Sequence, residues 1–147
     1  MTQTAAASLE RTLILVKPDG VSRNLIGEVL ARVERKGYRI VRLQRRSADA
    51  DLLAQHYAEH VGKPFYQPLV DFMSSGPVVS AVAEGHRVIE GFRALAGATD
   101  PTAALPGTIR GDFGRDWGLQ VQQNLVHGSD SAESAAREIA LWFPGDS

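Results

Sequence analysis

The sequence of 147 residues contains no cysteine. This absence excludes disulfide frameworks and thiolate zinc sites, and it is typical of proteins from reducing compartments. No stretch approaches about 18 consecutive apolar residues, the length that a membrane-spanning helix needs. The first ten residues lack the basic segment and apolar run of a secretory signal. We therefore expect a cytoplasmic protein that does not contact membranes.

Neither sign of charge is in excess. The chain has 16 Lys and Arg against 17 Asp and Glu, for a formal net charge of -1. It therefore lacks the basic surplus that draws proteins onto nucleic acids, and no nucleic-acid partner is expected. Hydrophobic residues make up 44% and charged residues 22%, which is typical of one ordinary globular domain. We expect a loose N-terminal tail over residues 1–10 and a single domain over residues 11–147.

Apolar patterning predicts both strands and helices along the chain. The run Thr12–Val16 is continuously apolar, which indicates a strand buried on both faces, and Lys17–Gly20 breaks it. Further strands are predicted at Tyr38–Leu43, Pro77–Val82 and Val121–Val126. Helices are predicted from Asn24 to about Gly37 and at Asp49–His60, Pro64–Met73, Arg87–Ala96 and Ser131–Phe143.

The order of these elements contains a βαββαβ core with extra helices between its second and third strands. It predicts an α+β fold, a ferredoxin-like antiparallel sheet with added helices and with the helices on one face. Residues 97–120 show no regular pattern and are rich in Gly, Pro, Thr and Asp. Loops of this length are uncommon in compact domains unless they are functional, so we expect a long functional loop.

A histidine lies between the last predicted strand and the last predicted helix. Asp130 and Glu133 have the spacing of a capping box, which places the start of the helix directly after Asp130. His127 then lies near a helix N-terminus, where free N–H groups and the helix dipole favour a bound phosphate. A neutral imidazole is nucleophilic, and Glu138 is spaced to orient the ring. The alternative is that His127 only ends the strand and hydrogen-bonds the turn.

Three basic side chains have two interpretations each. Lys17 ends the first strand, Arg93 lies on a predicted helix and Arg110 lies in the long loop. Each is either a solvated surface charge or a group that binds phosphate.

Aromatic residues cluster in the helices between the second and third strands. Tyr57 and Phe65 either belong to the core or stack on a nucleobase. His56 and His60 form an i,i+4 pair, but no acidic partner completes a metal site, so a zinc function is not expected.

Longer motifs carry a family resemblance. They span about Arg11 to Phe143, nearly the whole chain. They are Lys17–Val21 (KPDGV), His56–His60 (HYAEH), Lys63–Phe65 (KPF), Met73–Val79 (MSSGPVV), Pro106–Phe113 (PGTIRGDF) and Asn124–Ser131 (NLVHGSDS). Together they resemble the nucleoside diphosphate kinase family, and the last resembles its active-site signature.

This resemblance implies a kinase with a ping-pong mechanism. The γ-phosphoryl group of a nucleoside triphosphate, usually ATP with Mg²⁺, passes to His127 and then to a nucleoside diphosphate. The nucleotide phosphates hold the Mg²⁺, so no protein side chain is expected to bind metal directly. The resemblance also implies a homotetramer or homohexamer built from dimers.

The resemblance further assigns roles around the nucleotide. Glu138 and Ser129 orient His127. The groups around the transferring phosphate and the sugar are Lys17, Tyr57, Arg110 and Asn124. Those on the diphosphate are Arg93 and Thr99, and those on the base are Phe65, Leu69 and Val121. Stacking reads no hydrogen-bond pattern, so a base held by Phe65 is consistent with broad base tolerance.

The chain departs from the family in one segment. Between Arg110 and Asn124 it has about four extra residues, which coincide with Arg115–Gly118, an echo of the preceding Gly111–Gly114. The family's aliphatic base contact falls on Val121 counted back from Asn124, and on Trp117 counted forward. We assign Val121, because the predicted strand fixes its register from the histidine side. We expect the extra residues to bulge outward at the rim of the nucleotide pocket.

Two alternatives belong to other functional classes. The first is a nucleotide-binding regulatory module without catalytic activity, against which intact His127, Lys17, Arg110 and Asn124 argue. The second is an RNA-binding platform on the βαββαβ core. The acidic balance argues against it, as does the lack of exposed aromatic pairs on the two middle predicted strands.

Overall fold

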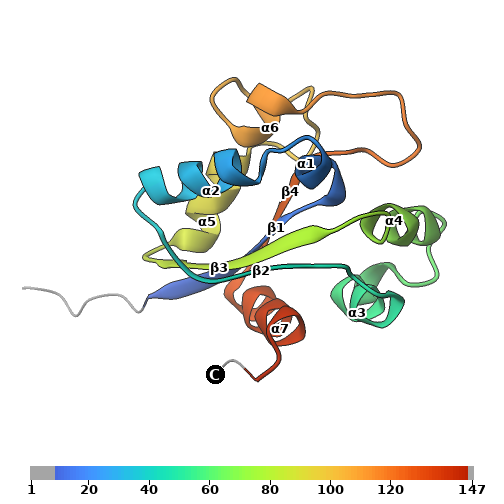
Figure 1. The fold of residues 1–147 in the computed structure, drawn as a ribbon, viewed down its shortest axis with the longest axis horizontal. Coiled ribbons are helices and arrows are strands. Elements are labelled where there is room, and N and C mark those ends of the chain that lie inside the picture. Colours follow the sequence, from blue (N-terminus) through green and yellow to red (C-terminus); the bar gives the residue numbers. More distant parts are fainter. Residues whose placement is uncertain (1–8, 146–147) are drawn as a thin grey trace, which may run out of the picture.

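The structure is a computed structural model that describes residues 9–145. Its centre is a four-stranded antiparallel sheet with the strand order β2-β3-β1-β4 (Figure 1). The strands are β1 (Glu10–Val16), β2 (Arg39–Arg46), β3 (Val78–Gly85) and β4 (Val126–Gly128). This sheet and its helices confirm the predicted ferredoxin-like α+β fold.

Helices connect and cover these strands. They are α1 (Pro18–Ser22), α2 (Ile26–Arg35), α3 (Ala50–His56), the 3₁₀ turn η1 (Ala58–His60), α4 (Tyr66–Met73), α5 (Val88–Ala96), α6 (Ile109–Phe113) and α7 (Ala132–Trp142). Among the described residues, no helix has the length and apolar character needed to cross a membrane.

Helices cover both faces of the sheet, so the prediction that they lie on one face was wrong. Ile14 and Val16 face a core formed with α2 and α5, whereas Leu13 and Leu15 face a second core formed with α3, α4 and α7. Figure 1 shows α2 and α5 on one side of the sheet and α7 on the other. Because β1 is apolar on both sides, each of its faces requires a covering layer, as the continuous apolar run predicted.

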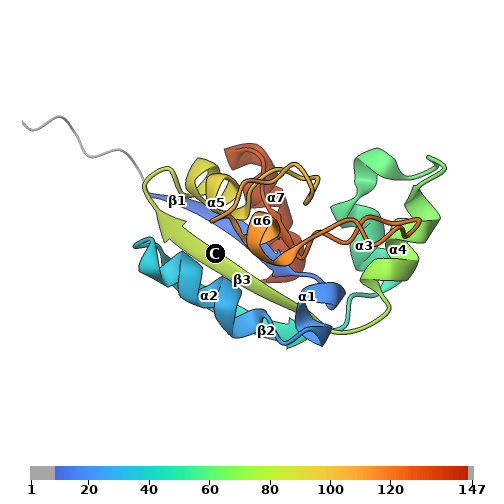
Figure 2. The same cartoon turned by 90° about the horizontal axis from the view of Figure 1, so that it is seen from above.

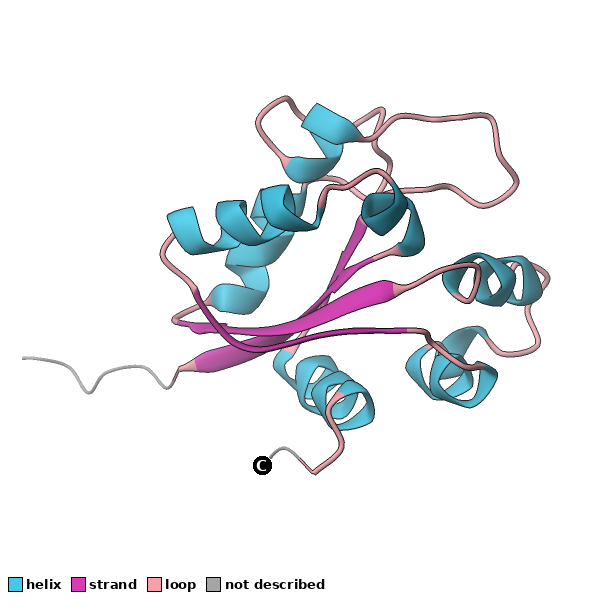
Figure 3. Ribbon diagram, viewed as in Figure 1, coloured by secondary structure: helices cyan, strands magenta, loops and turns pink. Residues whose placement is uncertain are grey.

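Two short helices occupy segments that were predicted to be irregular. The predicted break after the first strand is α1, which Pro18 starts at its first position, where a missing N–H and a fixed φ favour a helix. Within the long loop, Thr108 caps α6 by accepting a hydrogen bond from the Gly111 N–H at 3.0 Å. Figure 3 shows the remaining loop on both sides of α6.

The last strand and helix begin later than predicted. A strand was predicted at Val121–Val126, but the observed β4 shares only Val126 with it, because β1 pairs with β4 from Ile14 to Val16 and then gives way to α1. The cap of α7 is Ser131, whose hydroxyl accepts from the Ser134 N–H at 3.0 Å, rather than Asp130. Near the other terminus, β1 already begins at Glu10, inside the predicted tail, while residues 1–8 lie outside the described part of the chain.

The helices α3 and α4 lie together at one end of the sheet. Seen from above, the loop between α6 and β4 reaches toward this pair (Figure 2). Residues from the middle and from the end of the sequence therefore approach each other at this end of the molecule.

Candidate active site

The pairing of β1 with β4 positions the candidate histidine. Leu15 lies opposite His127, and the Lys17 N–H donates to the Leu125 carbonyl at 2.8 Å. This register brings the Lys17 side chain to Asn124, where its Nζ donates to Oδ1 at 2.9 Å. The Asn124 amide in turn donates to the Thr99 carbonyl at 3.1 Å. Three predicted site residues far apart in sequence are thus connected beside His127.

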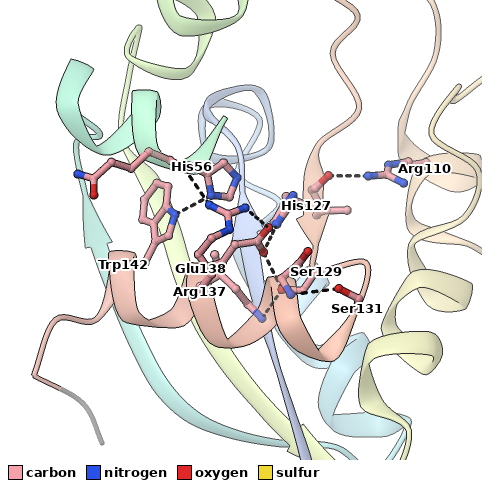
Figure 4. Close-up of polar contacts among 12 residues, drawn as sticks. His56, Arg110, His127, Ser129, Ser131, Arg137, Glu138 and Trp142 are labelled. Carbon is pink, nitrogen blue, oxygen red and sulfur yellow. Dashed lines mark hydrogen bonds and ion pairs between the residues drawn. The ribbon is translucent and has the colours of Figure 1, made fainter. Parts of the chain in front are cut away.

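Glu138 holds the ring of His127 from α7. Its Oε1 lies 2.9 Å from His127 Nε2 and also accepts from the Ser129 hydroxyl at 2.7 Å (Figure 4). Ser129 is fully buried and accepts a further hydrogen bond from the Leu13 N–H of β1 at 3.1 Å. A carboxylate that accepts at Nε2 leaves Nδ1 as the unprotonated nitrogen of a neutral ring.

The environment of Glu138 favours its charged form. Burial alone raises the pKa of this carboxyl, but the hydrogen bond from His127, the charge of that imidazole when it is protonated and the hydrogen bond from Ser129 outweigh burial and lower the pKa. Glu138 is therefore a carboxylate at neutral pH, and it stabilises positive charge on the ring next to it.

His56 is a neighbour of His127 that the sequence did not predict. The two ring centroids lie 4.8 Å apart, and the indole N–H of buried Trp142 donates to His56 Nδ1 at 3.1 Å (Figure 4). Burial, followed by repulsion from His127, lowers the pKa of His56 to about 3. The ring is neutral, with its proton on Nε2. One signal could have indicated that His56 is buried, because it lies with Leu52 and Leu53 on the buried face of α3.

Leu125, between Asn124 and β4, adopts a left-handed backbone conformation with φ of 73°. Asp19 holds it there, because its carboxylate accepts from the Leu125 N–H at 3.0 Å. Gly20 of the same helix approaches the Leu125 carbonyl so closely that an added Cβ would lie 3.2 Å from it. Burial raises the pKa of Asp19 above its ordinary value, and the nearby Lys17 ammonium offsets only part of this increase. The segment around Asp19 thus fixes the backbone conformation of the residues before His127, a role that the sequence did not reveal.

Two of the predicted cations are partly buried. Burial, with a contribution from the charge of Arg110, lowers the pKa of Lys17 to about 8. Burial and then the charge of Arg93 lower the pKa of Arg110 to about 10. A bound anion would relieve both the desolvation and the repulsion among these like charges.

Arg110 also ties the loop segments together. It donates through Nε to the Asn124 carbonyl at 3.0 Å, through Nη1 to Gly97 at 2.9 Å and through Nη2 to Val126 at 2.6 Å. A guanidinium has five N–H donors, so two remain for a ligand. The predicted phosphate clamp therefore also organises the walls of its own site.

A cavity of about 250 Å³ opens beside His127 and Glu138, and Lys17, Arg110 and Asn124 are not among the described residues that line it. The predicted residues that line it are Tyr57, Arg93, Thr99, His127 and Glu138. His56, Glu59 and His60 line it as well. The walls of the cavity therefore carry the candidate nucleophile, two arginines (Arg93 and Arg137) and aromatic rings.

The residues predicted to contact the base lie farther out. Phe65 is 50% exposed, and its ring lies 5.1 Å from that of His60 on the cavity wall. Leu69 is partly buried against the second core. Val121 lies in the loop before β4, so the strand that was expected to fix its register is not there. Neither Leu69 nor Val121 lines the cavity in the described structure.

The extra residues Arg115–Gly118 lie in this outer loop. The Trp117 ring lies 4.5 Å from the Arg115 guanidinium and 5.7 Å from that of Arg23. Arg23, which follows α1, also donates to the Phe113 carbonyl at 2.6 Å. None of the four extra residues is among the described residues around the cavity.

One group of potential metal ligands occurs among the described residues. Nitrogen and oxygen atoms of His56, His127 and Glu138 lie within 4.8 Å of one another. However, His56 Nδ1 already accepts a hydrogen bond from the Trp142 indole, and the Glu138 carboxylate is already hydrogen-bonded to His127. Mg²⁺ prefers an octahedron of oxygen ligands, so these imidazoles do not form a magnesium site.

Comparisons with known proteins agree on one family. A model described as nucleoside diphosphate kinase matches residues 10–147. A nucleoside diphosphate kinase of Mycobacterium tuberculosis strain H37Rv is 64% identical over 137 residues, which cover 92% of this chain and 98% of that protein.

Two solved structures are also similar. A nucleoside diphosphate kinase family protein from Babesia bovis has a TM-score of 0.86 and 50% identity, covering 92% of this chain and 88% of its own. A halophilic nucleoside diphosphate kinase from Halobacterium salinarum, solved in complex with CDP, has a TM-score of 0.86 and 49% identity, covering 93% and 89%.

Proposed function

The chain belongs to the nucleoside diphosphate kinase family, and on that premise we propose that His127 is the residue that carries the phosphoryl group. Enzymes of this family pass the γ-phosphoryl group of a nucleoside triphosphate to a nucleoside diphosphate through a phosphohistidine. The observation that supports His127 is its bond to Glu138 at Nε2, which leaves Nδ1 unprotonated beside the cavity.

The transfer follows from this arrangement. The lone pair of Nδ1 forms a bond to the γ-phosphorus while the bond from that phosphorus to the leaving β-phosphate oxygen breaks. The ring gains positive charge as this bond forms, and the Glu138 carboxylate stabilises that charge through the Nε2 proton. Ser129 keeps the carboxylate in place through its own hydrogen bond. The second half of the reaction reverses these steps with the terminal phosphate oxygen of a nucleoside diphosphate as acceptor.

The remaining predicted residues hold the nucleotide. Arg93 and Thr99 contact the diphosphate, and Lys17 and Arg110 supply positive charge near the phosphoryl group that moves. Tyr57 and Asn124 contact the sugar and the transferring phosphate, and Phe65 stacks on the base, with Leu69 and Val121 nearby. The cavity that Tyr57, Arg93 and Thr99 share with His127 supports this assignment, as does the bond from Lys17 to Asn124.

Kinases of this family use a divalent metal, which we propose is Mg²⁺ bound mainly by the nucleotide phosphates. The carboxylates of Glu59 and Asp130 line the same cavity and fit a hydrated cation, because they can accept hydrogen bonds from its water ligands. The ion offsets negative charge on the phosphates and orients them.

Assembly and location are proposed from the family resemblance and the composition. We propose a homotetramer or homohexamer built from dimers, which light scattering at working concentration distinguishes. We also propose a cytoplasmic protein whose partners are nucleoside di- and triphosphates, without nucleic acid or membrane. A single domain covers residues 11–147.

Intact-mass measurement tests the function. After incubation with ATP and Mg²⁺, the protein should gain the mass of one phosphoryl group, and ADP or GDP should remove it. The His127→Ala variant should gain nothing, whereas His86→Ala, which changes an exposed histidine outside the cavity, should behave as the unchanged protein. A folded protein that binds nucleotide without gaining the phosphoryl group would instead support the catalytically idle module.

A further inference from the structure

The side chain of His60 lies between two residues of the nucleotide site. Its ring stacks on Tyr57, with centroids 6.0 Å apart and an interplanar angle of 27°. Its other contact is edge-to-face with Phe65, at 5.1 Å and 65°. We propose that His60 is a nucleoside-positioning residue that braces the Phe65 ring for base stacking, an inference that rests on the function proposed above.

The backbone of this segment links the same residues. The His60 N–H donates to the Tyr57 carbonyl at 2.8 Å, and the His60 carbonyl accepts from the Lys63 N–H at 3.0 Å. Lys63 continues the series by accepting from the Tyr66 N–H at 3.0 Å. Successive tight turns therefore carry the chain from Tyr57 on the cavity wall, through His60 on the same wall, to Phe65 farther out.

Packing holds the His60 ring. Its Nδ1 is buried and has no hydrogen-bond partner within the described part of the chain. Contacts between ring faces and edges, rather than a hydrogen bond at this nitrogen, therefore set its orientation. An apolar ring of similar shape at this position should preserve the same support.

Phe65 needs such support because half of its surface is exposed. Its ring pairs with that of His60 and with no other aromatic ring of the described residues. A ring that is free to change rotamer loses entropy when a base stacks on it, whereas a ring held in place has already lost it. His60 therefore acts on nucleoside binding through Phe65 and leaves the chemistry at His127 unchanged.

The expected size of the effect follows from the geometry. An edge-to-face aromatic pair changes an equilibrium by about three- to tenfold beyond the area that it buries. Truncating His60 to Ala should therefore lower the second-order rate constant for phosphoryl transfer to a nucleoside diphosphate by about that factor. The rate of His127 phosphorylation by a donor without base or sugar should not change.

A double-mutant cycle tests the brace. The variants are His60→Ala, His60→Phe, Phe65→Ala and the double variant His60→Ala/Phe65→Ala, with exposed His86→Ala as the matched control. Each full-length protein is phosphorylated with phosphoramidate, which carries neither base nor sugar. Its transfer to GDP and to CDP is then measured by rapid quench, and its folding by thermal unfolding.

We expect five results. His60→Ala slows transfer to both diphosphates about three- to tenfold, and His60→Phe restores it to within about twofold. In the Phe65→Ala background, His60→Ala causes no further loss of the transfer rate. The phosphoramidate rate stays constant across the series, and His86→Ala changes neither rate.

Other outcomes overturn the inference. It fails if His60→Ala leaves the diphosphate rates unchanged, if His60→Phe does not restore them, or if the losses at His60 and Phe65 add independently. A fall of the phosphoramidate rate that matches the fall with diphosphates would show a role in chemistry or folding instead. A parent protein that accepts no phosphoryl group from either phosphoramidate or ATP would refute the proposed function itself, which is a separate result.

Discussion

Replacing Glu138 with Gln removes the negative charge next to His127 while keeping the shape of the side chain. In the structure, one oxygen of this carboxylate accepts hydrogen bonds from both the His127 ring nitrogen, at 2.9 Å, and the Ser129 hydroxyl, at 2.7 Å. The amide oxygen of Gln can still accept both hydrogen bonds. The substitution therefore isolates the contribution of charge to phosphoryl transfer.

The expected loss of phosphoryl-transfer rate in Glu138→Gln lies between two limits. A hydrogen bond to a charged group exceeds a neutral one by about 1 to 1.5 kcal/mol, which corresponds to about a tenfold loss of rate. Two full charges about 4 Å apart at an effective dielectric constant of about 20 interact by about 4 kcal/mol, which corresponds to about a thousandfold loss. We expect Glu138→Gln to slow the chemical step by about ten- to a thousandfold.

The assay is single-turnover phosphorylation of His127 by saturating ATP with Mg²⁺, followed by rapid quench and intact mass. Glu133→Gln is the matched control, because Glu133 is an exposed carboxylate in the first turn of the same helix. It should transfer at the parent rate. A Glu138→Gln protein that is folded and transfers as fast as the parent would refute the electrostatic role of the carboxylate.

Stability offers a second measurement on the same variant. The pKa of Glu138 lies below its ordinary value of 4.5 in the folded protein, so its charge stabilises the fold above that pH. This contribution is lost as the pH falls through the folded pKa. The difference in unfolding free energy between the parent and Glu138→Gln should therefore shrink in acid.

Three further predictions concern stability, pH and the extra loop. Ser129→Ala leaves the buried Leu13 N–H without its acceptor, so we expect a loss of about 1 to 3 kcal/mol in denaturant unfolding, and an unchanged midpoint would contradict this. Because burial lowers the pKa of Lys17 to about 8, its positive charge is lost as the pH rises through that value, so kcat/KM for ATP should fall there; a profile that stays flat well above pH 8 would count against a role for the ammonium. Deleting Arg115–Gly118 should change nucleotide affinity in a binding titration and leave the single-turnover rate intact, whereas the reverse pattern would place the loop in the chemistry.

Local patterns predicted most of the regular elements because their physical causes are local. The helix α2 and the strands β1 and β3 follow from apolar periodicity, and the observed bounds differ from the predicted ones by a few residues. The strand predicted at Val121–Val126 was placed too early, since it shares only Val126 with β4 and the position of a strand depends on its partner. Once β1 gives way to α1 after Val16, the residues before Val126 have no strand to pair with.

The site was predictable in part for the same reason. The family resemblance assigned Glu138 to orient His127, and in the structure Glu138 Oε1 lies 2.9 Å from His127 Nε2. His56 was missed because nothing in a local pattern distinguishes a buried core histidine from one that contacts a nucleophile. Its contact with His127 requires α3 and α7 to pack on the same face of the sheet.

By itself, the sequence determined the class of fold and the family, and it led to His127 as the proposed nucleophile, because these depend on residue type and order along the chain. The tertiary structure decided which groups surround that nucleophile and in which protonation state. Lys17 and Asn124 are 107 residues apart, yet they share a hydrogen bond that follows only from the antiparallel pairing of β1 with β4. The lowered pKa values of Lys17 and His56 likewise arise from burial, which no local sequence pattern contains, because desolvation is a property of the assembled core.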